Sequence, residues 1–238
     1  MKSHAPGQGE SRLEGGNSTE AVVLIDGAVH RPVSANGEYV HELLGHLEEV
    51  GFIAAPRFEG LDDQGREVLT YLEGDVPHNV KDTKWSDDQL KRAAGLLRGF
   101  HDATTGTSLA AQGEVVCHND FAPWNVVFVG DQPTAIIDFD DATPGPRIRD
   151  VSYALWCWLG IGSEAHSVDD QAARLRLMCG EYGLQDLARV LPEIAERQQE
   201  IRAKHLVEGR AEQAEGVDRD IEWLSKNRAE LEDKVMNP

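Results

Sequence analysis

The feature that most constrains this chain is a polar loop at residues 118–125, which lies between short apolar runs. The run Val115–Cys117 enters the loop, and the run 126–129 leaves it. A further apolar run, 134–137, ends at Asp138. Short apolar runs bounded by turn-forming residues are typical of strands. The pattern therefore predicts a strand, a polar loop and a hairpin, with oxygen-bearing side chains on the loops that leave the sheet.

The residue types on these loops suit phosphoryl transfer. A carboxylate at Asp120 can accept the proton of an attacking hydroxyl, while the amide oxygen of Asn125 and the carboxylate of Asp138 hold Mg²⁺ against the phosphates. The sequence has no cluster of His and Cys residues that would suit zinc. The alternative is structural: Asp120 caps its loop, and Asn125 and Asp138 cap a turn and a strand end.

The first third of the chain predicts a small antiparallel sheet with one helix. Two hairpins are indicated by apolar runs that flank turn residues: 21–25 with 28–31 around Asp26-Gly27, and 58–61 with 67–72 around 62–65. Four apolar residues at helical spacing indicate a helix that ends at Gly51: Val40, Leu43, Leu44 and Leu47.

After Gly74 the pattern becomes mainly helical. Ser86 is the expected N-cap of a helix that continues to His101. Further helices are expected at 150–159, 168–182, 186–212 and 218–232. We therefore predict an α+β fold of two lobes: a flexible tail at 1–11, a small antiparallel β N-lobe with one helix at 12–73, and a larger, mainly helical C-lobe at 74–238.

Composition excludes several classes of protein. There are 23 Lys and Arg residues against 42 Asp and Glu residues, which gives a net charge of −19. Such a chain is a poor candidate for binding nucleic acid or an anionic membrane. No stretch approaches the roughly 18 apolar residues of a membrane span, and the N-terminus lacks the apolar segment of a signal peptide. The three cysteines are widely spaced, so we expect reduced thiols in a cytoplasmic protein.

The loop sequence HNDFAPWN, followed by IDFDDATPGPR and Asp150, resembles the aminoglycoside phosphotransferase and choline-kinase-like family. The resemblance extends from about Leu13 to Glu232 and includes the segments LEGGN, GREVLTYLEG and LLRGFHDAT. It implies a protein-kinase-like two-lobe fold. It also implies an ATP-dependent phosphotransferase with Mg²⁺ as cofactor, which moves the γ-phosphate to a hydroxyl of a small molecule, such as an aminoglycoside-like antibiotic or another cationic metabolite.

The resemblance implies a role for each matching residue of the loop region. Asp120 matches the catalytic Asp, and Asn125 and Asp138 match the two Mg²⁺ ligands. His118 matches the residue that braces the catalytic loop. Asp150 matches the structural Asp that ties the following helix to that loop.

The resemblance also implies a nucleotide site in the N-lobe. The residues that match it are Gly15, Gly16 and Asn17 over the phosphates, Arg31 at the position of the usual phosphate-binding Lys, and the linker from Thr70 to Leu72 beside adenine. The chain departs from the family pattern at two positions. Arg31 stands in place of the usual Lys, and Val40 stands where relatives place the acid that pairs with that Lys. His41 and Glu42 are both candidates to replace this acid.

The run of acids at the end of the last apolar strand raises the question of the acceptor. Asp140 and Asp141 either help to bind a metal or a cationic acceptor, or are solvated charges. The net acidity likewise either attracts a cationic small molecule or serves solubility alone.

A second function stays open beside phosphoryl transfer: a non-catalytic, kinase-like immunity protein that sequesters a toxin or an antibiotic. The complete set Asp120, Asn125 and Asp138 favours the enzyme, since a sequestering protein has no need to keep all three. The departures at Arg31 and Val40 favour the binding protein.

Overall fold

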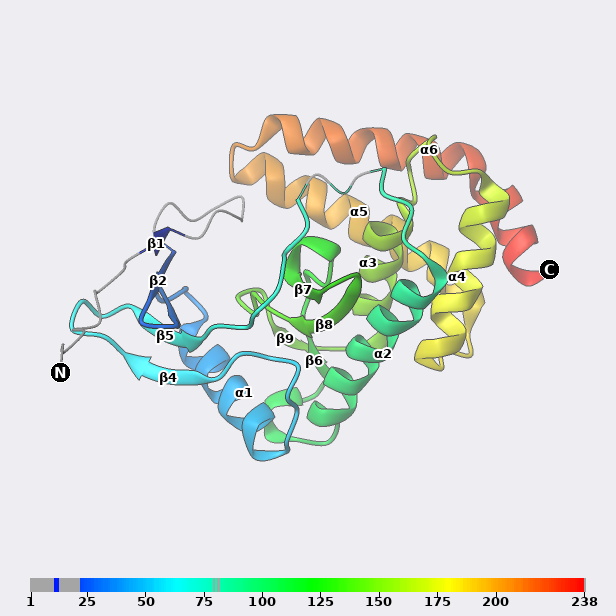
Figure 1. The fold of residues 1–238 in the computed structure, drawn as a ribbon. Coiled ribbons are helices and arrows are strands. Elements are labelled where there is room, and N and C mark those ends of the chain that lie inside the picture. The colour runs from blue at the N-terminus through cyan, green and yellow to red at the C-terminus, as the bar shows by residue number, and fades with distance from the viewer. Residues whose placement is uncertain (1–10, 13–21, 79, 81, 238) are drawn as a thin grey trace.

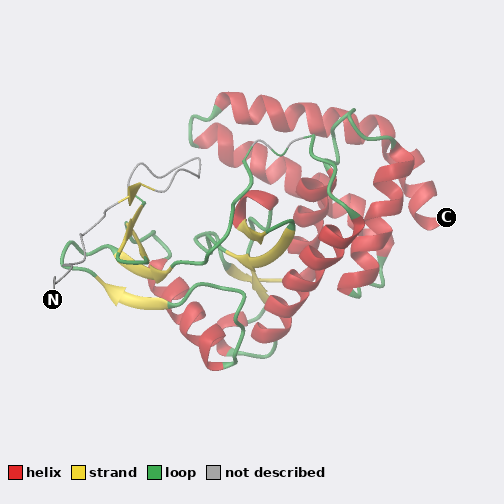
Figure 2. Cartoon of the chain, viewed as in Figure 1, coloured by secondary structure: helices red, strands yellow, loops and turns green. Residues whose placement is uncertain are grey.

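The computed structural model describes residues 11–12, 22–78, 80 and 82–237. Figure 1 shows strands β1 to β5 and helix α1 on the N-terminal side of the molecule and helices α2 to α6 on the other side. Figure 2 shows that strands occupy the N-terminal side and the centre, while the far half is helical. The α+β architecture with a small sheet and a larger helical part is therefore confirmed.

Five antiparallel strands form the N-terminal sheet in the order β1-β2-β3-β5-β4. Their bounds are Ser11–Arg12 (β1), Val23–Ile25 (β2), Ala28–Arg31 (β3), Phe58–Leu61 (β4) and Glu67–Thr70 (β5). Asp26 and Gly27 both have positive φ, 50° and 85°, as a two-residue hairpin turn requires. Both predicted hairpins are present. Ser11 of β1 pairs with Leu24 of β2, and residues 1–10 of the predicted tail lie outside the described residues.

Helix α1 (Gly37–Glu49) follows the first hairpin and buries the predicted apolar stripe. It also reaches across to the helical part of the molecule. The Tyr39 hydroxyl donates to the Leu109 carbonyl at 2.8 Å, and His46 Nε2 lies 2.8 Å from the Ala103 carbonyl. These contacts fix α1 relative to helix α2 (Asp87–Thr104), whose N-cap is Ser86, as predicted. Ser86 also forms a capping box with Gln89.

Two two-stranded sheets lie at the centre of the helical part, where β6 pairs with β9 and β7 pairs with β8. Their bounds are Val115–Cys117 (β6), Val126–Val129 (β7), Gln132–Ile136 (β8) and Thr143–Gly145 (β9). The remaining helices are α3 (Arg147–Leu159), α4 (Val168–Tyr182), α5 (Val190–Val207) and α6 (Ala211–Met236), with short 3₁₀ helices at Ser108–Ala110, Pro123–Asn125 and Leu187–Arg189. None of the helices in the described ranges combines the length and apolar character of a membrane span.

The last predicted helices differ from those observed. A helix at 186–212 is wrong, because a 3₁₀ turn opens that segment and α5 ends at Val207. Gly209 has φ 73°, and the Arg210 N–H donates to the His205 carbonyl at 2.8 Å. This is the glycine-terminated helix end that satisfies otherwise unpaired carbonyls. Helix α6 therefore begins at Ala211 and not at residue 218.

The chain passes from the N-terminal sheet to the helical part at Gly74. This glycine has φ 148°, and a Cβ added to it would lie 2.4 Å from the Phe128 carbonyl oxygen. Asp75 then exchanges two backbone hydrogen bonds with Phe128 of β7, both 2.8 Å long. Only a residue without a side chain permits this close crossing, so the linker after β5 runs against β7 at a fixed point.

Candidate active site

Two loops that leave the central sheets lie side by side. One loop, 118–125, follows β6, and the other, 137–142, precedes β9, the strand with which β6 pairs. The Ile137 N–H donates to the Asn125 carbonyl at 3.0 Å, which joins the loops a second time. The polar pattern of the sequence therefore becomes one three-dimensional cluster.

Two of the loop residues have an unusual backbone conformation. Asn119 and Asp138 have φ of 63° and 64°, in the left-handed region. Asn and Asp adopt this region more readily than other residues with side chains. In each loop the left-handed conformation therefore falls on a residue type that tolerates it.

The Asp120 carboxylate is held on both oxygens. The Tyr153 hydroxyl donates to Oδ1 at 2.6 Å, and the Asn125 amide donates to Oδ2 at 2.7 Å. Burial raises the pKa of Asp120, and these hydrogen bonds offset only part of that effect. The result is a fixed carboxylate that takes up a proton more readily than a solvated one, as a general base requires.

The residues present fit the Mg²⁺ that the resemblance implies. Asn125 commits its amide hydrogens to the carbonyl and the Oδ2 atom of Asp120, which leaves its amide oxygen without a donor among the described residues. The Asp138 side chain is 44% exposed. Within the described ranges, no group of three or more His, Cys, Asp or Glu residues can hold a metal alone. Mg²⁺ commonly uses one or two protein oxygens and completes its shell with phosphate oxygens, so this donor set suits a metal–nucleotide complex.

The loop that carries Asp120 is braced from behind by Asp150. The fully buried Asp150 carboxylate accepts the backbone N–H groups of His118 at 2.5 Å and Asn119 at 2.7 Å. His101 Nε2 lies 3.0 Å from the same carboxylate. Burial alone would raise the pKa of Asp150, but the hydrogen bond and charge of His101 lead the effects that lower it overall.

His118 also braces the loop. Its Nε2 lies 3.0 Å from the Ile137 carbonyl, and its Nδ1 accepts the Asp120 backbone N–H at 3.3 Å. The ring therefore joins the 118–125 loop to the 137–142 loop. The geometry is that of a structural histidine.

Arg31, at the end of β3, reaches across to the second loop. Its Nη1 atom lies 3.2 Å from Asp138 Oδ1, and its Nη2 atom lies 2.6 Å from Asp140 Oδ1. Its Nε atom donates to Glu67 Oε1 at 2.5 Å. Burial alone would lower the pKa of the Arg31 guanidinium, and the neighbouring carboxylates, Asp140 first, raise it above its ordinary value.

The two acids considered for acceptor binding are both paired with cations. Burial raises the pKa of Asp140, and Arg31 offsets part of that shift. Asp141 accepts from Lys204 Nζ at 2.6 Å. Neither acid is therefore a free negative charge in this state.

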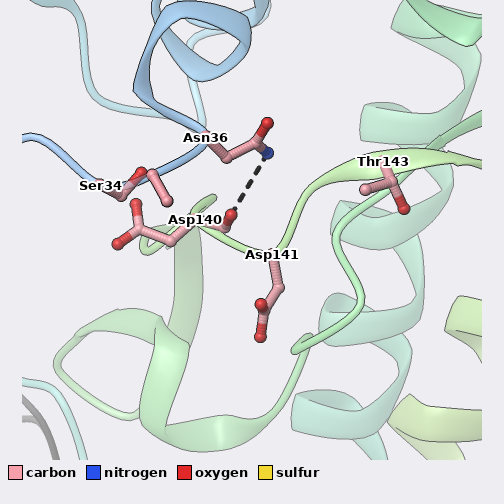
Figure 3. Close-up of a pocket in the computed structure, with 6 residues that line it drawn as sticks. Ser34, Asn36, Asp140, Asp141 and Thr143 are labelled. Atoms are coloured by element: carbon pink, nitrogen blue, oxygen red, sulfur yellow. Dashed lines mark hydrogen bonds between the residues drawn. The ribbon is translucent and has the colours of Figure 1, made fainter.

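A pocket of about 410 Å³ lies where the two parts of the molecule meet. Figure 3 shows residues that line it: Ser34, Asn36, Asp140, Asp141 and Thr143. The Asn36 amide, just before α1, donates to the carbonyls of Asp140 at 3.3 Å and Ala142 at 2.9 Å. Asn36 is the N-cap residue of α1, but its side chain makes no capping bond, because it crosses to the 137–142 loop instead.

The other residues expected at the nucleotide site are described only in part. Gly15, Gly16 and Asn17 lie outside the described residues. Thr70, at the end of β5, exchanges hydrogen bonds with Arg57 through its N–H and its hydroxyl. Leu72 lies half-buried in the linker before Gly74.

Sequence reasoning missed two residues of the cluster. Tyr153 stands three positions after Asp150 on α3, a spacing that puts both on one helix face and could have revealed it. Glu67 stands opposite Arg31 in the β3–β5 pairing, and only the strand order reveals that contact.

Sequence comparisons relate the chain to a family of phosphotransferases. Residues 11–192 match the model of the phosphotransferase enzyme family. The trifolitoxin immunity protein of Rhizobium leguminosarum bv. trifolii is 32% identical over 201 residues, which cover 72% of this chain and 73% of that protein.

Solved structures share the fold at low sequence identity. A choline/ethanolamine kinase family protein from Mesorhizobium loti has a TM-score of 0.64 and 15% identity, covering 96% of this chain and 93% of that one. The GDP complex of aminoglycoside 2'-phosphotransferase-IIIa has a TM-score of 0.59 and 17% identity, covering 98% and 95%. These neighbours confirm the kinase-like two-lobe fold, and the match over most of the sequence shows that the chain belongs to the phosphotransferase enzyme family.

Proposed function

We propose that this protein is an ATP-dependent phosphotransferase that moves the γ-phosphate to a hydroxyl of a small molecule. The observation that carries the proposal is the Asp120 carboxylate, which is buried, held by Tyr153 and Asn125, and adjacent to the loop that bears Asp138. A base, an oxygen donor set and a cation meet in this cluster, as phosphoryl transfer requires.

Each residue of the cluster has a distinct part in the proposed reaction. Asp120 orients the acceptor hydroxyl and takes its proton as the oxygen attacks the γ-phosphorus, while the bond from that phosphorus to the β–γ bridging oxygen breaks and ADP leaves. Asn125 fixes the Asp120 carboxylate through its amide hydrogens, and its amide oxygen and Asp138 would hold Mg²⁺, which neutralises phosphate charge. Arg31 presents to the phosphates the two Nη atoms that face Asp138 and Asp140 in this structure, and grips two phosphate oxygens at once. His118 and Asp150 keep the loop in place.

The nucleotide is proposed to lie between an N-lobe at 12–73 and a C-lobe at 74–238. Relatives of this fold have been solved with GDP, and with ADP and spectinomycin, which supports a purine nucleotide as donor. We assign the linker residues Thr70 and Leu72 to the adenine side. Gly15, Gly16 and Asn17 are assigned to the phosphate side.

The acceptor is proposed to be a cationic small molecule bound on the C-lobe near Asp120. Related structures hold kanamycin or gentamicin, which supports this class. Asp140 and Asp141 become available to it once the Nη atoms of Arg31 bind phosphate in place of Asp140 and Lys204 is displaced. Charge attraction of this kind weakens with salt, so kcat/KM for a cationic acceptor should fall as ionic strength rises.

The test is a screen for ATP consumption over hydroxylated cationic compounds with Mg²⁺, with mass spectrometry of the products. Wild type should transfer phosphate to at least one of them, and Asp120→Asn should transfer it at least about a hundredfold more slowly while still binding ATP. Equal ATP consumption by wild type and Asp120→Asn would contradict the proposal.

The similarity to the trifolitoxin immunity protein favours a second candidate function, in which the protein binds a toxin or an antibiotic without turnover. The two functions differ in their need for nucleotide. Protection of cells that survives both Asp120→Asn and Asp138→Ala would identify sequestration as the activity.

A further inference from the structure

The cation of the candidate site is anchored by an acid that does not come from helix α1. Val40, at the position where relatives place that acid, is buried in the core. Arg31 Nε instead donates to Glu67 Oε1 at 2.5 Å, and the Glu67 side chain is 1% exposed. The β3–β5 pairing places these two residues directly opposite each other. A buried carboxylate needs a paired cation, so this contact is a fixed feature of the sheet.

The second oxygen of Glu67 connects the anchor to helix α1. His41 Nε2 donates to Glu67 Oε2 at 2.7 Å. The His41 ring stacks on Phe58 of β4, with ring centroids 3.7 Å apart and planes 8° apart. Glu67 thus joins α1 to the strand that carries Arg31, and the exposed Glu42 beside His41 takes no part in the contact.

Anchoring at Nε determines where the rest of the guanidinium points. The guanidinium is planar, so its Nε edge and its outer edge, formed by Nη1 and Nη2, face in fixed directions relative to each other. With Nε held by Glu67, the outer edge faces Asp138 and Asp140. A lysine ammonium has three donors that rotate about one nitrogen, so holding one of them does not fix the direction of the others as it does in the planar guanidinium. The arginine in place of lysine and the acid on β5 in place of α1 therefore form one arrangement.

We propose that Glu67 is a positioning residue that fixes the Nε edge of Arg31, so that the outer edge of the guanidinium is directed at the nucleotide phosphates. His41 supports it by linking the anchor to α1. This inference rests on the proposed phosphotransferase function and adds to it the acid that the sequence left unassigned.

The test measures binding and needs no acceptor. Dissociation constants for ATP with Mg²⁺ and for adenosine are measured by calorimetry for wild type, Glu67→Gln, Arg31→Ala and the double variant. Glu42→Gln is the matched control, because it removes a carboxylate from α1 beside His41. We expect Glu67→Gln to weaken ATP binding about tenfold, since a charge-assisted contact that orients the cation is lost. Adenosine affinity should change less than twofold, and the double variant should bind ATP as weakly as Arg31→Ala alone.

A second variant covers the case in which Glu67→Gln does not fold. His41→Phe keeps an aromatic ring against Phe58 and removes the donor to Glu67, and we expect it to weaken ATP binding about threefold with adenosine affinity unchanged.

The inference is overturned if Glu67→Gln binds ATP like wild type, if adenosine affinity falls equally, or if the Glu67 and Arg31 effects add. Equal weakening by Glu42→Gln would place the anchor on α1 and also overturn it. If wild type itself binds no ATP with Mg²⁺, the proposed function fails and takes this inference with it, which differs from a wild type that binds normally beside an unaffected Glu67→Gln.

Discussion

Replacing Asp150 with Asn tests how the catalytic loop is held. The Asp150 carboxylate accepts three N–H groups: the backbone groups of His118 and Asn119, and Nε2 of His101. Asparagine has the same shape but one acceptor oxygen, so one of the three donors faces an amide NH₂ group and loses its partner. The loop that carries Asp120 then loses part of its support.

The expected loss of stability follows from that count. One unsatisfied buried donor costs about 1–3 kcal/mol, and the two remaining hydrogen bonds each weaken by about 1 kcal/mol when the acceptor loses its charge. Removal of a buried charge returns part of this cost. We therefore expect Asp150→Asn to lower the free energy of unfolding by about 3 kcal/mol, a large part of the roughly 5–15 kcal/mol of a typical protein.

Urea unfolding measures this effect against a matched aspartate. Asp102 pairs with Arg98 and Arg147, and its side chain is 48% exposed. Asp102→Asn should therefore cost less than about 1 kcal/mol. A loss at Asp150 no larger than the loss at Asp102 would refute the assignment of Asp150 as the brace of the loop.

The pH dependence of stability is a second test of the role of Asp150. Burial alone would raise the pKa of Asp150, but the effects led by His101 lower it. A carboxylate whose pKa is lower in the folded state contributes stability above its unfolded pKa of about 4, and that contribution is lost as pH falls through the folded pKa. The difference between wild type and Asp150→Asn should thus shrink as pH falls below about 4.

Asp120→Asn should lower kcat by about 10²–10⁴-fold with ATP affinity unchanged, as single-turnover and binding measurements can show. Since burial raises the pKa of Asp120, its ionised form destabilises the fold above that pKa, and Asp120→Asn should unfold at higher urea than wild type at neutral pH. Asp138→Ala should weaken ATP binding with Mg²⁺ far more than without it, and equal weakening in calorimetry would make Asp138 structural. Gly74→Ala should cost at least about 2 kcal/mol more than Gly65→Ala, which has positive φ but no atom within 4 Å of an added Cβ.

Local pattern in the sequence predicts much of the N-terminal sheet and the first helices. The Asp26-Gly27 pair specifies a turn by its own backbone preference, and Ser86 specifies a helix start. Strand β9, Thr143–Gly145, has no apolar run, because it is held by pairing with β6, a partner distant in sequence. The end of α5 was missed because apolar spacing continues across Gly209, whose positive φ breaks the helix.

Some residues of the candidate site could likewise be predicted from local sequence, and others could not. Asp120, Asn125 and Asp138 follow short strands that the local pattern predicts, so all three could be proposed as site residues from the sequence. Glu67 could not be assigned, because its contact depends on β3 lying next to β5, which are separated in sequence by α1 and β4. Sequence spacing points to His41 and Glu42, the helix neighbours of Val40, whereas the acid that contacts Arg31 lies on strand β5.

The surroundings of Asp120 bear on the choice between catalysis and sequestration. An asparagine at this position could accept from Asn125 and pair with the Tyr153 hydroxyl without placing a charge in a buried site. Burial raises the pKa of Asp120, so the ionised form of this carboxylate carries a cost in stability. A protein that only sequesters a ligand gains nothing from that cost, while proton removal from an acceptor hydroxyl depends on the charge. A destabilising carboxylate held by two directed hydrogen bonds is therefore the arrangement expected of a base in use, and it favours transfer over sequestration.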